Sequence, residues 1–161
     1  MLYPIQLEWA VARQVDLPGA AHLVLDSGVR YLDPAPAVFE AMLQGWTRQQ
    51  KSRFLNDTGT ITPRVRRVRR FAEFTNQYPW EWTPGELEAF TGELVSGAHP
   101  AVHSTIRSYH GALRMFCEFV TDTRYGWLDE CEQRFGQFPV QIAHEWNTVA
   151  HVVDYEPLTH W

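Results

Sequence analysis

The chain has 161 residues, of which 45% are hydrophobic and 14% aromatic, with seven Trp. This composition excludes an intrinsically disordered chain and predicts a single packed domain with a short extension. The sequence has no apolar run long enough to span a bilayer and no secretory signal pattern, so we expect a cytoplasmic protein without a membrane partner. Its two cysteines, Cys117 and Cys131, are too few for a disulfide framework, which agrees with a reducing compartment.

The formal net charge is −5, but the charges are segregated along the chain. Between residues 44 and 75, eight basic residues stand against only Asp57 and Glu73, so this segment carries +6 and the rest carries −11. Because salt screens charges beyond about 10 Å, a local basic patch can bind a polyanion although the whole chain is acidic. A solvated charged helix face is the alternative. The basic residues are Arg48, Lys51, Arg53, Arg64, Arg66, Arg67, Arg69 and Arg70.

The first 33 residues are expected to form an arm that either adds contacts to a ligand or packs on the main domain. Two short alternating runs flank the turn sequence Asp26-Ser27-Gly28. This pattern predicts a β-hairpin whose strands contain Leu23 and Leu25, then Val29 and Tyr31.

Residues 34–138 are expected to form an all-α domain, a compact bundle of four to five helices. The first helix is predicted over Pro36–Phe54 and is followed by a break at residues 56–59. The second begins at Thr62, an N-cap residue followed by Pro63, and continues to about Gln77.

The third helix begins at a capping box made by Thr83 and Glu86 and ends near Gly97. The fourth covers residues 101–121, a short fifth covers 127–135, and residues 139–161 are expected to be irregular. Apolar residues at helical spacing predict the core-facing side chains of the first four helices: Phe39, Met42, Leu43 and Trp46; Val65, Val68, Phe71, Ala72 and Thr75; Leu87, Phe90 and Leu94; Val102, Ile106, Tyr109, Leu113, Phe116 and Val120.

Two of these helices carry basic residues opposite their apolar face. On the second helix, four arginines between residues 66 and 70 fan over that side, and they repel one another unless an anion lies there. The polar face of the fourth helix has small and basic residues: His103, Ser104, Arg107, Ser108, Gly111 and Arg114. Gly111 costs about 1 kcal/mol relative to Ala in a helix interior. Either a closely approaching ligand or a tight helix crossing explains it.

The sequence contains no phosphate-binding loop, zinc knuckle or zinc-protease motif, so we expect no cofactor and no catalytic residue. The only metal-capable set is Cys117, Cys131, His144 and His151, whose spacing matches no known ligand pattern. Buried structural thiols are therefore the favoured interpretation, and a metal-stabilised domain is the alternative.

The stretches ITPRVRRVRRFAEFTNQYPW and HSTIRSYHGALRMFCEFVTD resemble the N-terminal core-binding (SAM-like) domain of tyrosine recombinases of the phage-integrase family. The resemblance covers about Pro36 to Phe135. Through FGQFPVQIAHEWNTVAHVVDYE the chain is similar to a subgroup of bacterial site-specific integrases.

The resemblance implies a helical jaw of a C-shaped clamp around a recombination half-site, with the second and fourth helices against the major groove. It makes duplex DNA the expected partner, together with other integrase protomers. The implied DNA-binding residues are Arg64, Arg66, Arg67, Arg69 and Arg70 on the second helix, and His103, Ser104, Thr105, Arg107, Ser108 and Arg114 on the fourth.

In that family a second domain supplies the tyrosine nucleophile and its Arg/Lys/His constellation. By resemblance it would begin near Tyr155–Trp161, so we expect no strand cleavage by this chain alone. A helical protein-interaction module, whose basic face meets an acidic partner, is the alternative function.

Overall fold

The computed structural model describes residues 17–25, 32–54 and 58–149. These residues form helices and contain no strand, which confirms the all-α class. The α-helices are α2 (Ala21–Val24), α3 (Pro34–Phe54), α4 (Thr58–Thr75), α5 (Pro84–Ser96), α6 (His103–Thr121) and α7 (Trp127–Phe135), and three single 3-10 turns are η1 (Pro79–Glu81), η2 (Thr123–Tyr125) and η3 (Glu145–Asn147). No helix in these ranges is both long and apolar enough to cross a bilayer.

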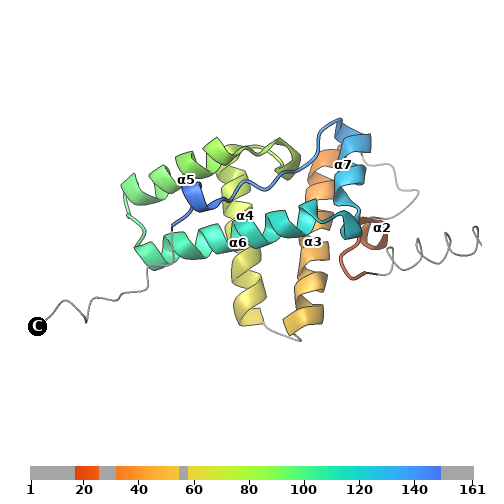
Figure 1. Cartoon of the computed structure of the whole chain (residues 1–161), viewed down its shortest axis with the longest axis horizontal. Helices are drawn as coiled ribbons and strands as arrows, with labels where there is room; N and C mark the ends of the chain where they lie inside the picture. The colour runs from red at the N-terminus through yellow and green to blue at the C-terminus, as the bar shows by residue number, and fades with distance from the viewer. Residues whose placement is uncertain (1–16, 26–31, 55–57, 150–161) are drawn as a thin grey trace, which may run out of the picture.

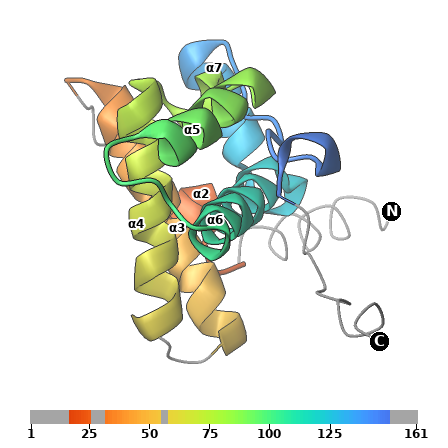
Figure 2. The same ribbon diagram turned by 90° about the vertical axis from the view of Figure 1, so that its left-hand side faces the viewer.

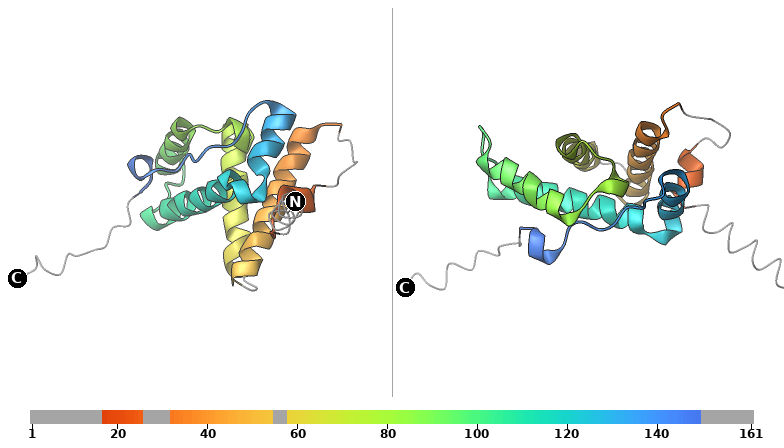
Figure 3. Two further views of the ribbon diagram at one scale, coloured as in Figure 1. Left: turned by 45° about the vertical axis from the view of Figure 1, so that its right-hand side comes forward. Right: turned by 90° about the horizontal axis from the view of Figure 1, so that it is seen from above.

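Helix α6 lies at the centre of the bundle (Figure 1). Helices α3 and α4 form an antiparallel hairpin that crosses α6, and the joined ends of the two helices project beyond it (Figures 1 and 2). Residues 139–149, called the C-terminal segment below, lie on the other side of α6, away from α3 and α4 (Figure 3). Because it is enclosed from two sides, α6 buries His110, Ala112, Cys117 and Phe119 in addition to its predicted apolar face.

The core is rich in aromatic side chains, as the composition predicts. Trp46 and Trp127 are almost completely buried, and Trp46 meets Phe116 edge to face with ring centroids 5.3 Å apart. Such pairs contribute about 0.5–1.5 kcal/mol beyond the burial of their area. One predicted core residue is wrong: Val102 is 65% exposed, because it precedes the first turn of α6 instead of lying within it.

The predicted beginning of α4 is also wrong. The helix begins at Thr58, four residues before the predicted N-cap, and Pro63 lies inside it. A proline there removes one backbone hydrogen bond and is normally unfavourable. The additional turn is stabilised by Ile61, which is buried in the bundle. By contrast, the box at the beginning of α5 is confirmed, since the backbone N–H of Thr83 donates to Glu86 Oε1 at 2.8 Å.

The predicted β-hairpin is contradicted at its first strand, because Leu23 lies in the short helix α2. Residues 26–31 are outside the described residues. Helix α2 packs on α3 and buries Ala20, Ala21 and Leu25, whereas an isolated hairpin would bury little. The indole N–H of Trp127 also donates to the Gly19 carbonyl at 3.0 Å. Residues 17–25 therefore pack on the bundle.

The segment from Pro139 to Val149 is irregular apart from η3, as predicted, yet it is fixed to α6. Ile142 and Ala143 are buried. The Gln141 amide donates to the Arg114 carbonyl at 3.1 Å, and the backbone N–H of Val149 donates to His110 Nδ1 at 2.9 Å. The other ring nitrogen, Nε2, lies 2.8 Å from Thr91 Oγ1 on α5. His110 therefore joins α5, α6 and the C-terminal segment.

This buried histidine predicts a loss of stability in acid. Burial, followed by the nearby positive charge of Arg114, lowers the pKa of His110 from 6.5 to about 4. The unfolded chain therefore binds more protons than the folded chain between these values. The free energy of unfolding should fall by about 1–3 kcal/mol as the pH is lowered from 6.5 to 4.

Urea unfolding at several pH values measures this effect. The variant His110→Gln cannot gain a proton in this range and should lose that part of the pH dependence, whereas His99→Gln, at an exposed loop position, should keep it. Equal pH dependence in His110→Gln and the parent chain would contradict the prediction.

Candidate nucleic-acid interface

The basic residues gather on the projecting hairpin of α3 and α4. The sequence has no Asp or Glu between residues 41 and 56 or between 58 and 72, so nothing within these stretches neutralises them. Lys51 and Arg53 lie in the last turn of α3, where cations also interact favourably with the helix dipole. That interaction explains two of the charges but none of those on α4.

A surface groove of about 360 Å³ separates the N-terminal half of α4 from α6. We call it the α4–α6 groove, and it is lined by Gly59, Thr60, Pro63, Arg64, Arg67, Ser108, Gly111, Ala112 and Met115. A Cβ atom built on Gly111 would meet no atom within 4 Å apart from the adjacent backbone of its own helix. A tight helix crossing therefore does not explain this glycine. Its place in the wall of an open groove agrees with the alternative, that a ligand approaches α6 closely.

The arginines of α4 have different surroundings. Arg69 makes a two-pronged ion pair with Glu40 of α3, in which Nη2 lies 2.8 Å from Oε2, and this contact lowers the pKa of Glu40. Arg70 lies over the ring of Tyr109 on α6, 5.8 Å from its centroid. Arg64 donates to Gln50 Oε1 at 3.1 Å. Arg69 is therefore already paired within the protein.

Two predicted arginines of α4 have no partner among the described residues. Arg66, on the outer side of α4, and Arg67, in the α4–α6 groove, make no hydrogen bond or ion pair with any described residue. Repulsion between such neighbours is not relieved inside the protein. An anion outside it would supply the missing countercharge.

The predicted residues of α6 divide into two groups. His103, Ser104 and Thr105 are exposed at the beginning of the helix, and Arg107 and Ser108 are half-buried next to them. Arg114 instead donates to Thr148 Oγ1 at 2.9 Å, so it contacts the C-terminal segment. The structure thus brings Arg67 and Ser108 together at one groove and holds Arg114 apart from it.

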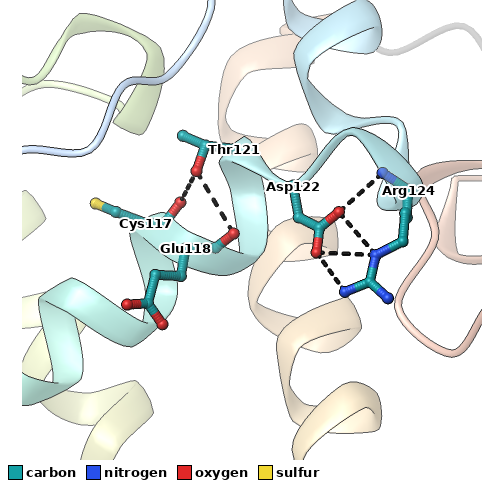
Figure 4. Close-up of polar contacts among 5 residues, drawn as sticks. All are labelled: Cys117, Glu118, Thr121, Asp122 and Arg124. Carbon is teal, nitrogen blue, oxygen red and sulfur yellow. Dashed lines mark hydrogen bonds and ion pairs between the residues drawn. The ribbon is translucent and has the colours of Figure 1, made fainter.

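The α4–α6 groove continues into a second hollow toward the end of α6. Arg64 and Met115 line both, and the second hollow adds Arg53, Glu118, Asp122 and Arg124 among its walls. Arg124 is neutralised there: its Nη2 lies 2.7 Å from Asp122 Oδ2, as Figure 4 shows. The positive charge of the combined groove is therefore concentrated at the α4 end.

Both cysteines are buried, as the favoured interpretation predicts. Burial raises the pKa of each thiol to about 12. Figure 4 shows Cys117 on α6, where its carbonyl accepts a hydrogen bond of 2.6 Å from the Thr121 hydroxyl. Within residues 17–25, 32–54 and 58–149, no three His, Cys, Asp or Glu side chains are grouped to hold a metal ion, and His151 lies outside these ranges.

Sequence reasoning counted Arg48, Lys51 and Arg53 in the basic segment but did not assign them to the site. Their position on a helix beside α4 depends on how the hairpin closes, and no local pattern reveals that. No family model, curated protein or solved structure matches this chain.

Proposed function

We propose that the chain binds duplex DNA through the α4–α6 groove and the outer face of α4, as the core-binding part of a tyrosine recombinase. The observation that carries this proposal is the pair of neighbouring cations Arg66 and Arg67, which have no countercharge among the described residues, with Arg67 in the wall of an open groove that also contains Gly111 of α6. The resemblance to integrase core-binding domains supports the same partner. The chain performs no strand cleavage alone and works in the cytoplasm, where the DNA lies.

The contacts divide by chemistry. Arg66, Arg67 and Arg70 supply charge to phosphates, which gives affinity for every sequence and a strong dependence on salt. Arg107, together with Ser104 or Ser108 on α6, contacts the edges of the bases and so recognises the sequence. The guanidinium group can form a bidentate contact to guanine, and the hydroxyl groups can donate or accept.

A protein-interaction module is the second candidate, and one observation favours it. Trp146 on the C-terminal segment and Phe138 just before it are 67% and 51% exposed, respectively, although large aromatic side chains are normally buried. These residues lie apart from both groove linings. Binding of another protein there is compatible with binding of DNA on α4, and contact with other integrase protomers would use such a surface.

The test is a fluorescence-anisotropy titration of the full chain with generic duplex DNA at about 50 mM and 200 mM salt. The three phosphate contacts from α4 predict a slope of about −3 or steeper for log K against log salt concentration. An affinity that is the same at both salt concentrations, or no binding at either, would contradict the proposal and favour the protein-interaction module.

A further inference from the structure

A second basic groove lies between α3 and α4. Two hollows form it, and they share Thr47, Val65 and Arg69, so the groove is continuous. We call it the α3–α4 groove, and its lining comprises Leu43, Gln44, Thr47, Arg48, Lys51, Ile61, Thr62, Val65, Arg66 and Arg69. None of these residues lines the α4–α6 groove, because α4 turns different residues toward its two neighbours.

The lining contains four cations and no acidic residue. Arg48, Lys51 and Arg66 make no hydrogen bond or ion pair with any residue that the structure describes, and only Arg69 is neutralised, by Glu40. A protein surface normally mixes charges of both signs. Three unpaired cations on the two walls of one groove therefore form an electrostatic match for a polyanion.

Adjacent residues of α4 line the two grooves. Arg66 lines the α3–α4 groove and its neighbour Arg67 lines the α4–α6 groove, so positive charge continues from one groove to the other. A small anion would occupy one such place only. A chain of phosphates that passes over the N-terminal half of α4 would reach the cations of both.

We infer that the α3–α4 groove is a second surface for the phosphodiester backbone of duplex DNA, with Arg48 and Lys51 as its phosphate-binding residues. The inference rests on the proposed function and extends its footprint to α3. Arg69 does not bind a phosphate in this arrangement, because its guanidinium group already donates two hydrogen bonds to Glu40. The number of phosphates bound on this side is thus limited by an acidic residue of the protein itself.

The loss-of-charge test uses Arg48→Gln/Lys51→Gln in the full chain, with duplex binding followed over a series of salt concentrations. Loss of two phosphate contacts should weaken binding on every sequence and flatten the salt slope by about 2. Arg134→Gln is the control, because it removes a cation from α7, where Arg134 pairs with Glu130. It should leave the slope unchanged. Thermal unfolding verifies that each variant is folded.

The gain-of-charge test uses Glu40→Gln, which releases Arg69 into the α3–α4 groove. Binding should become tighter by several-fold and the salt slope steeper by about 1. Glu132→Gln makes the same change of net charge on α7 and should have no such effect.

The outcomes separate this inference from the proposed function. Unchanged affinity and slope in Arg48→Gln/Lys51→Gln and in Glu40→Gln, with weaker binding by Arg67→Gln/Arg107→Gln, would overturn the α3–α4 groove and leave the proposed function intact. Absence of duplex binding by the parent chain would overturn both. A flatter slope in the double variant together with a steeper one in Glu40→Gln would establish the second surface.

Discussion

Replacement of Gly19 by Ala is expected to lower the free energy of unfolding by about 2–5 kcal/mol. Gly19 has a φ of +90°, which L-residues rarely adopt, and this strain alone costs about 1–3 kcal/mol. A Cβ atom would also lie 2.5 Å from the carbonyl oxygen of Gly45 on α3 and 2.9 Å from Phe119 on α6. Relief of this overlap would separate α3 from the segment that precedes α2, and such overpacking costs about 1–3 kcal/mol more.

Thermal unfolding measures this effect, which should lower the melting temperature by about 10 °C for a chain of this size. Gly92→Ala is the matched control. Gly92 lies in α5, and a Cβ atom there meets nothing within 4 Å, so the change should stabilise the chain by about 0.5–1 kcal/mol. Equal melting temperatures in the two variants would refute the close approach of Gly19 to Gly45.

The triple variant Arg66→Gln/Arg67→Gln/Arg70→Gln is expected to lose most of its affinity for duplex DNA. Glutamine keeps the helix propensity of arginine but removes its charge. Removal of three phosphate contacts should flatten the salt slope by about 3, to nearly zero for the contacts on α4. Titration with duplex DNA at two salt concentrations measures the affinity and the slope. All duplex sequences should be affected alike, because phosphates carry no sequence information.

Loss of folding must be separated from loss of charge in this experiment. Arg70 lies over Tyr109, and loss of this contact costs about 0.5–1 kcal/mol at an exposed site. The melting temperature should therefore fall by only a few degrees. A triple variant that is folded and binds DNA with an unchanged salt slope would remove these arginines from the interface.

Much of the helical framework was predictable because its signals are local. The apolar spacing of Phe39, Met42 and Trp46 identifies the buried side of α3, and the pair of Thr83 and Glu86 marks the beginning of α5. Each of these signals depends on residues within two turns of one another. Tertiary packing therefore rarely changes the structure that these local signals predict.

The errors arose where distant residues decide the structure. Ile61 extends α4 because the bundle buries it, and residues 17–25 are shaped by Gly45 and Trp127. The basic face of α4 was predictable from periodicity. The pairing of Arg69 with Glu40, across 29 positions, was not. Nor was the contact of Arg114 with Thr148, since both depend on which helices become neighbours.

The central position of α6 has a consequence for how such a chain can diverge. Nine of its residues are buried, and large-to-small changes of buried aliphatic or aromatic side chains cost about 2–5 kcal/mol. His103, Ser104 and Thr105 are exposed, and changes at exposed positions usually alter stability by less than about 0.5 kcal/mol. Mutations that survive selection on α6 will therefore accumulate on that narrow strip. A lineage could exchange one recognition preference for another there while the scaffold beneath it stays the same.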